Sequence, residues 1–172
     1  MANRQLNIQS VRKMPFEIDA GIGHRARIGL LVLQTDQTLE AELAHLTALK
    51  GVALYNARLS NDAVVTPETL ARMVQELPCA AELISPLLCL SAIGYACTSG
   101  STIIGEARVA QILTRTHPGV PSSNPLTAAK VAFNALGISR VGLVTPYTPD
   151  VTLAMQANFV AAGIDVPVVG SF

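Results

Sequence analysis

Short apolar runs, separated by segments of helical character, are the feature that most constrains how this chain folds. None of the runs approaches the eighteen or so uninterrupted apolar residues of a membrane-spanning helix. They also lack the polar alternation of half-exposed strands, which favours buried parallel strands covered on both faces. Five runs are predicted as strands: residues 27–34, 52–58, 87–96, 141–145 and 166–169.

The segments between these runs carry the start and stop signals of helices. Thr66-Pro67 and Asn124-Pro125 have the form of a cap followed by proline, and Gly137 is placed to end a helix. This alternation with short turns predicts an α/β fold with a doubly wound parallel sheet. The predicted helices cover residues 36–50, 66–77, 102–114, 124–136 and 148–163, with a short helical piece at 80–85.

Composition narrows the class of protein further. Half of the 172 residues are hydrophobic, the mean hydropathy is +0.42, and the formal net charge is zero. This charge balance argues against a nucleic-acid partner, and the apolar runs argue against a membrane partner. Three irregularly spaced cysteines do not form a disulfide framework, and residues 1–26 lack an apolar signal core, so we expect a cytoplasmic protein.

An internal echo suggests how the domains are organised. The segment RIGLL at residues 27–31 is repeated as RVGLV at 140–144, and each copy leads to a loop with threonine and a helix. Either the chain contains a duplication, or both segments follow the general preferences of such strands. A duplication predicts an N-terminal arm (1–26), a complete first α/β lobe (27–118) and a second lobe (119–172) that is cut short after its second strand.

One cysteine carries the candidate chemistry. Cys97 follows the predicted strand 87–96 and precedes Thr98 and Ser99. Ligands of such sheets bind at the carboxyl ends of the strands, where Thr35 and Tyr147 are also predicted. Backbone N–H groups at a helix start favour a thiolate or a bound carboxylate. The alternatives are a small buried hydrophobe at Cys97 and ordinary helix caps at Thr98 and Ser99.

The other cysteines, the histidines and the glycines give little evidence for a second functional site. Cys79 and Cys89 stand among apolar residues, which predicts core positions for both. The three histidines show no ligand spacing, so no metal is predicted. No glycine-rich phosphate loop or dinucleotide fingerprint is present in the sequence, which makes a flavodoxin-like nucleotide binder the weakest interpretation.

Three motifs carry a resemblance to a known family: RIGLLVLQTDQTLEAE at 27–42, ACTSGS at 96–101 and LGISRVGLVTPYT at 136–148. Together they resemble the aspartate/glutamate racemase superfamily, and within it the branch of maleate cis–trans isomerase and arylmalonate decarboxylase. The TDQTLE segment is most similar to the ectoine-utilisation members of that branch. The resemblance covers the chain from about residue 27 to its last residue.

The resemblance implies two flavodoxin-like lobes related by a pseudo-twofold, with a cofactor-free site between them and one cysteine from each lobe. Cys97 matches the first cysteine, and the second has no counterpart in these 172 residues. Thr98, Ser99 and Tyr147 match groups that bind a substrate carboxylate. Asp36 stands where the isomerase has asparagine, which places a carboxylate beside an expected anion. Thr35 and Asp36 are candidates for substrate contact, with capping of the first helix as the alternative.

The predicted function is therefore a cofactor-independent isomerase or racemase that acts on a small carboxylate or dicarboxylate through a cysteine thiolate, with ectoine degradation as one setting. The alternative is a catalytically incomplete fragment that serves as a carboxylate-binding or partner-binding module. Such a fragment would expose apolar surface and associate, so a homo-oligomer is also predicted.

Overall fold

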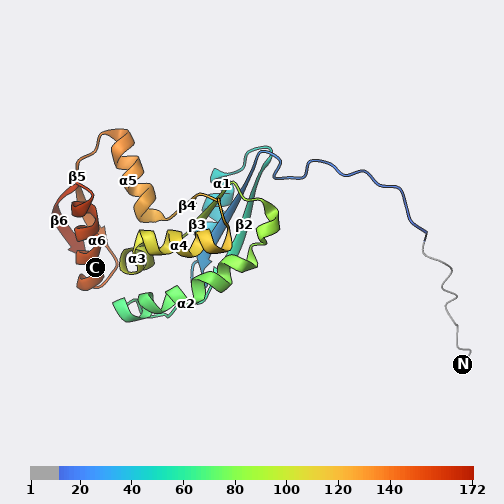
Figure 1. Ribbon diagram of the computed structural model, residues 1–172. Helices are drawn as coiled ribbons and strands as arrows, with labels where there is room; N and C mark the ends of the chain where they lie inside the picture. Colours follow the sequence, from blue (N-terminus) through green and yellow to red (C-terminus); the bar gives the residue numbers. More distant parts are fainter. Residues whose placement is uncertain (1–11) are drawn as a thin grey trace, which may run out of the picture.

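The computed structural model describes residues 12–172, and Figure 1 shows two packed units with an extended arm. The elements in chain order are β1 (Ala26–Leu33), α1 (Leu39–Leu46), β2 (Val52–Leu59), α2 (Pro67–Leu83), η1 (Pro86–Leu88), β3 (Ala92–Tyr95), α3 (Thr98–Ile104), α4 (Glu106–Thr116), β4 (Ser122–Ser123), α5 (Pro125–Leu136), β5 (Arg140–Thr145), α6 (Pro149–Ala161) and β6 (Asp165–Ser171).

The first unit, which we call the first lobe, is built on a four-stranded parallel sheet in the order β2-β1-β3-β4. Side chains alternate between the two faces of β1. Leu31 faces the core that α2 and α4 cover, whereas Leu30 faces a groove between α1 and α5. The main core therefore lies on the α2 and α4 side of the sheet, and Cys97 belongs to it.

The second lobe, from α5 to β6, contains a two-stranded parallel sheet of β5 and β6. Its inner face packs on α5 and α6, where the rings of Phe133 and Phe159 lie 5.8 Å apart between centroids. On the outer face, Val144 is 67% exposed and Val168 is 65% exposed. Both copies of the sequence echo form first strands, β1 and β5, although only β1 is flanked by strands on both sides.

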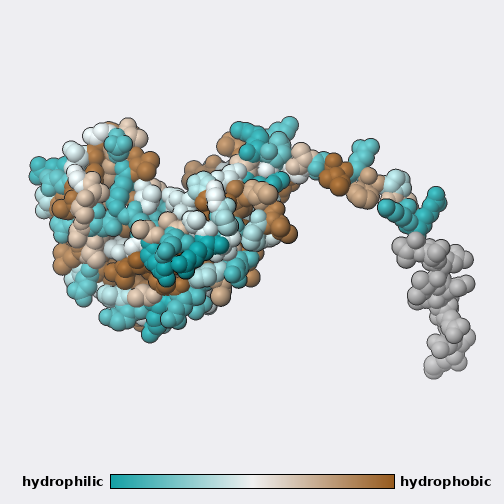
Figure 2. All heavy atoms as spheres, in the orientation of Figure 1, coloured by the Kyte–Doolittle hydropathy of each residue, from teal (hydrophilic) through white to brown (hydrophobic). Residues whose placement is uncertain are grey.

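The parallel α/β architecture is as predicted, and β4 extends the first sheet beyond residue 118. The predicted domain boundaries themselves stay a prediction. The arm predicted over residues 1–26 lies outside the described residues up to position 11. From residue 12 on, the chain extends away from the body (Figure 1), and its apolar side chains Met14, Phe16 and Ile18 are exposed (Figure 2). It joins the body just before β1, where the backbone N–H of Arg25 donates to the carbonyl of Gly51.

Several helix predictions were wrong in their bounds. The helix predicted over 36–50 is shorter, because α1 covers only Leu39–Leu46 and ends before Gly51. The pieces expected at 66–77 and 80–85 form one helix, α2, which passes through Pro78. The helix continues because Leu77, Ala80 and Ala81 stay on its buried face, and this packing outweighs the hydrogen bond that proline cannot donate. Its predicted start is confirmed, since Thr66 and Thr69 form a reciprocal capping box.

The predicted strand over 87–96 is the largest error of the sequence analysis. Only Ala92–Tyr95 pairs in the sheet, because Pro86–Leu88 forms a 3₁₀ turn and Cys89 adopts a left-handed conformation with φ of 51°. Cys79 and Cys89, predicted as core residues, are both exposed. Cys79 lies on the outer side of α2, and Cys89 lies in the turn that precedes β3.

The helix predicted over 102–114 starts earlier and is broken. It begins at Thr98, directly after Cys97, and it divides into α3 and α4 at Gly105. Gly105 has a φ of 88°, which a residue with a side chain adopts only at a cost. The early start matters for the site because it makes Cys97 the residue that caps α3.

No helix formed by residues 12–172 combines the length and the apolarity needed to cross a bilayer.

Candidate active site

Cys97 joins the carboxyl end of β3 to the start of α3, as the sequence predicted. Its Sγ accepts a hydrogen bond from the backbone N–H of Gly100 at 3.2 Å, and it lies 3.7 Å from the hydroxyl oxygen of Ser99. The carbonyl of Cys97 accepts a hydrogen bond from the buried hydroxyl of Ser101 at 2.7 Å. The first turn of α3 therefore holds Cys97 through both its side chain and its backbone carbonyl.

Gly100 is required by the close packing around this thiol. A Cβ at position 100 would lie 2.2 Å from the hydroxyl oxygen of Tyr95 and 2.9 Å from the Sγ of Cys97. Tyr95 is fully buried, and both burial and the neighbouring Cys97 raise the pKa of its phenol. The glycine thus leaves room for a phenol and a thiol to lie against the same helical turn.

Tyr147 reaches the same place from the second lobe. Burial raises the pKa of the Tyr147 phenol, and so does the negative charge of a Cys97 thiolate nearby. Hydrogen bonding with the side chains of Thr98 and Ser99 offsets part of this increase. Tyr147 also packs against the hydrophobic core that contains Cys97, so its side chain lies near Cys97, Thr98 and Ser99. The structure therefore brings together four of the six predicted site residues.

The backbone of Tyr147 is fixed by hydroxyl groups around it. Its carbonyl accepts hydrogen bonds from Ser171 at 2.7 Å and from Thr152 at 3.4 Å, and its N–H donates to Thr145 at 3.3 Å. These contacts come from β5, α6 and β6. The backbone of Tyr147 is consequently attached to the second lobe by hydrogen bonds from three of its elements.

The thiol itself is enclosed. Cys97 is 4% exposed, and its neighbours Thr98 and Ser99 open onto different cavities. Thr98 lines a largely apolar groove of about 510 Å³ between α1 and α5, which Figure 2 shows as a hollow in the upper surface. Ser99 lines a small cavity of about 30 Å³ behind α2.

Asp36 lies on the wall of the groove that Thr98 also lines. Its Oδ1 accepts hydrogen bonds from the backbone N–H groups of Thr38 and Leu39, each at 2.9 Å. Asp36 therefore caps the start of α1, which was the alternative to substrate contact. Asn124 lines the same groove, and its Oδ1 caps α5 through two backbone N–H groups.

Thr35 is exposed and is turned toward β2. Its backbone N–H and its hydroxyl contact the Oδ1 of Asn61, and its hydroxyl also accepts a hydrogen bond from the Asn61 Nδ2 at 3.0 Å. The sequence analysis missed Asn61. The signal was present, because Asn61 follows a predicted parallel strand just as Thr35 and Cys97 do.

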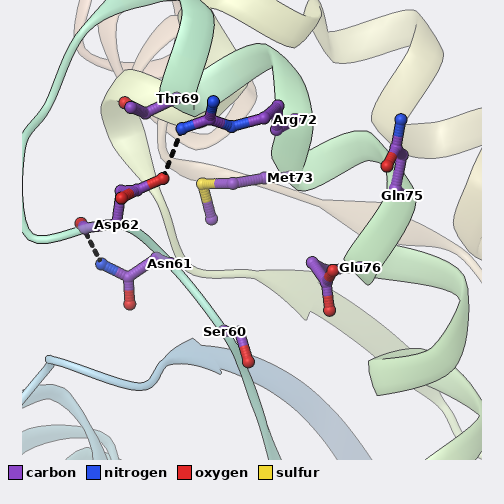
Figure 3. Close-up of a pocket in the computed structure, with 8 residues that line it drawn as sticks. All are labelled: Ser60, Asn61, Asp62, Thr69, Arg72, Met73, Gln75 and Glu76. Carbon is purple, nitrogen blue, oxygen red and sulfur yellow. Dashed lines mark hydrogen bonds and ion pairs between the residues drawn. The ribbon is translucent and has the colours of Figure 1, made fainter.

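Asn61 also borders a polar cavity of about 320 Å³ beside α2, shown in Figure 3. Arg72 and Asp62 both line this cavity, and the Arg72 guanidinium forms a salt bridge with the Asp62 carboxylate at 2.6 Å. Asn61, Asp62, Thr69 and Met73 line both this cavity and the small one that reaches Ser99. None of the predicted site residues lines the cavity of Figure 3 itself.

Across residues 12–172, no group of three or more histidine, cysteine, aspartate and glutamate side chains is placed to hold a metal ion.

Comparison with models of known families found no match, and neither did comparison with curated protein sequences. Solved structures, by contrast, are similar over most of the chain. The maleate isomerase Iso of Pseudomonas putida S16, as an alanine variant with maleate, has a TM-score of 0.71 and 25% identity over 85% of this chain and 63% of that one. This chain has the fold of maleate isomerase.

A second maleate cis–trans isomerase, from Nocardia farcinica, agrees with the first. Its cysteine-to-serine variant with a covalently bound succinylcysteine intermediate has a TM-score of 0.72 and 26% identity over 85% of this chain and 63% of that one. Unliganded arylmalonate decarboxylase, at 22% identity and a TM-score of 0.66 over 85% and 61% of the two chains, shares the fold. The chain spans about 63% of the length of the maleate isomerases.

Proposed function

We propose that this chain is a cofactor-independent isomerase or racemase that acts on a small carboxylate or dicarboxylate through the thiolate of Cys97. The observation that carries the proposal is the packing of Tyr147, from the other lobe, against the core that contains Cys97, next to Thr98 and Ser99. The similarity to a maleate isomerase with maleate, and to one with a succinylcysteine intermediate, supports the substrate class and the covalent route.

With maleate as substrate, the Cys97 sulfur would add to one carbon of the double bond and form a C–S bond. The displaced electron pair would move to the other carbon and its carboxylate. The remaining C–C single bond can rotate, and return of the pair then expels the thiolate and leaves the trans acid. No proton is consumed in this sequence, and the Gly100 N–H donates to the sulfur that begins and ends as the thiolate.

Hydroxyl donors would supply the electrostatic part of catalysis. Thr98, Ser99 and Tyr147 can all donate to a substrate carboxylate and to the enolate-like charge that develops next to it. Donors fixed in place before the reaction need no reorganisation as the charge develops. The hydrogen bonds that hold the backbone of Tyr147 supply this fixed geometry.

The first experiment uses a background in which the exposed Cys79 and Cys89 are replaced by serine, so that Cys97 is the one remaining thiol. This protein is incubated with maleate, related dicarboxylates and small carboxylates of ectoine breakdown, and vinyl protons are followed by nuclear magnetic resonance. The TDQTLE segment motivates the ectoine-related compounds. We expect loss of the maleate signal in the presence of the background protein and none with Cys97→Ala.

Mass spectrometry on the same samples separates catalysis from binding. An adduct of one maleate on the peptide that contains Cys97 supports the covalent route. Equal turnover with and without Cys97 would remove this thiol from the mechanism. Binding of a carboxylate that protects Cys97 from alkylation, with neither turnover nor adduct, would instead favour a carboxylate-binding module.

A further inference from the structure

The polar contacts between the lobes gather at the two ends of α3. At its start, Tyr147 packs against the core that contains Cys97, beside Thr98 and Ser99. Beyond its end, the carboxylate of Glu106 meets side chains of α5 and α6. The second of these contacts has no place in the proposed chemistry, and its geometry indicates another role.

Glu106 uses both carboxylate oxygens toward the second lobe. Its Oε1 accepts a hydrogen bond from the hydroxyl of Thr127, and its Oε2 accepts from the ammonium of Lys130. The Nδ2 of Asn158 also donates to Oε2, at 3.4 Å. The pair of Glu106 and Lys130 is the one salt bridge that joins the two lobes within residues 12–172.

This pair is sheltered in a way that the other salt bridges are not. The side chains of Lys130 and Glu106 are 25% and 21% exposed, whereas those of Arg140 and Asp165 are 71% and 60% exposed. A partly buried charged pair with further hydrogen bonds contributes more than an exposed pair, and loss of one partner leaves the other uncompensated. Glu106 is therefore the strongest candidate for a fixed attachment between the lobes.

The position of Glu106 links this attachment to the site. It directly follows Gly105, where the chain turns from α3 into α4, and α3 begins with the residues that hold Cys97. On α6, Val151 packs in the same core as Cys97, and Asn158 lies seven residues later on the same side of the helix. The helix that follows Tyr147 is thus attached near Cys97 at one end and to Glu106 at the other.

We propose that Glu106 is a positioning residue that clamps the second lobe onto α3 and so keeps Tyr147 over the thiol of Cys97. The role rests on the proposed function in treating Cys97 and Tyr147 as parts of one site. Weakening the clamp should let the second lobe lift from α3 and expose the thiol. The consequence can be measured without any turnover.

The test measures the reaction of Cys97 with dithionitrobenzoate in the Cys79→Ser, Cys89→Ser background. We expect Glu106→Gln and Lys130→Met each to accelerate the reaction roughly tenfold or more, since a tenfold change corresponds to about 1.4 kcal/mol and hydrogen bonds to charged groups contribute about that much. The two variants change the local charge in opposite directions. A purely electrostatic effect on the reagent would therefore move their rates apart.

Matched controls define the outcome. Lys130→Arg keeps the donor and the charge and should restore the slow rate, and Asp165→Asn, which breaks the exposed pair with Arg140, should leave the rate unchanged. The pKa of Tyr147, followed by ultraviolet absorbance, should fall toward the ordinary value in Glu106→Gln. Folding is checked by circular dichroism, and Thr127→Val, which removes one hydrogen bond and no charge, replaces Glu106→Gln if that variant does not fold.

Unchanged thiol rates and an unchanged Tyr147 titration in folded variants would overturn the clamp. That result leaves turnover by the parent chain unaffected. Faster thiol reaction in a chain that never turns over any carboxylate would support the clamp and count against the proposed function instead.

Discussion

The N–H of Gly100 donates a hydrogen bond to the Sγ of Cys97 across 3.2 Å, and the packing there leaves no room for a side chain at position 100. The glycine lies inside a helix without a positive φ, so its reason is space and not backbone conformation. The space is occupied by the Tyr95 hydroxyl on one side and the thiol on the other. Position 100 therefore decides whether the sulfur can stay at the start of α3.

Gly100→Ala should destabilise the fold and displace the thiol. The added methyl would lie 2.2 Å from the Tyr95 hydroxyl, and Tyr95 has no room to withdraw because it is fully buried. Overpacking of this kind typically costs about 1–3 kcal/mol, measured by urea unfolding. Gly142→Ala is the control, because a Cβ there meets only a carbonyl oxygen at 4.0 Å. Equal stability of the two variants would contradict the packing described here.

The titration of Tyr147 should depend on Cys97. Because burial and the Cys97 charge raise its pKa, Cys97→Ala should lower that pKa toward 10, and Thr98→Val should raise it further by removal of a hydrogen bond. The measurement is the difference in ultraviolet absorbance between each protein and its Tyr147→Phe counterpart. A Tyr147 signal that is unaffected by both substitutions would place the phenol away from the thiol.

The sign of the accompanying stability change follows from the raised pKa. The folded protein holds the Tyr147 proton more tightly than the unfolded chain, so this contribution is fully present below pH 10. It is lost as the pH rises through the folded pKa. Alkaline unfolding should therefore begin at lower pH in the parent than in Tyr147→Phe, relative to their stabilities at neutral pH.

Glu106 should give a stability term with the opposite pH dependence. Burial alone would raise its pKa, but hydrogen bonds from Lys130 and Thr127 and the Lys130 charge outweigh this and lower it below the ordinary 4.5. The contribution is present above pH 4.5 and is lost as the pH falls through the lowered pKa. Melting temperatures of the parent and Glu106→Gln should differ at pH 7 and converge under acid conditions. A difference in melting temperature that stays constant across this pH range would show that the charge of Glu106 does not contribute to stability.

Asn124→Ala should destabilise α5 through loss of its cap. The Asn124 Oδ1 accepts from the N–H groups of Leu126 and Thr127, each at 3.1 Å, and replacement of such a cap typically costs about 0.5–2 kcal/mol. Asn124→Asp keeps the acceptor and should unfold close to the parent in urea. If both variants are equally destabilised, the side-chain amide that donates to Thr127 carries the effect instead.

The sequence predicted the ends of helices well where capping residues or glycines mark them. Gly137 and Gly163 have positive φ and lie where helices were predicted to end, and α5 and α6 do end there. Thr66 and Asn124 cap helices as predicted. Local signals of this kind act over a few residues, so they can be recognised without knowledge of the fold.

Errors arose where apolar content was the only guide. The run before Cys97 is as apolar as a strand, yet Leu87 is 90% exposed in a turn and only the end of the run enters the sheet. The gap predicted between the helical pieces 66–77 and 80–85 does not exist, because packing keeps α2 continuous through Pro78. The contacts of Glu106 with α5 and α6 join segments far apart in the sequence, and no local pattern indicates them.

The contacts of Tyr147 and of Glu106 lie at opposite ends of α3, a helix of seven residues that joins them. A ligand that displaces the Tyr147 phenol at one end would thus transmit strain to the Glu106 carboxylate at the other. Ligand binding beside Tyr147 and the strength of the Glu106 contacts between the lobes would then change together.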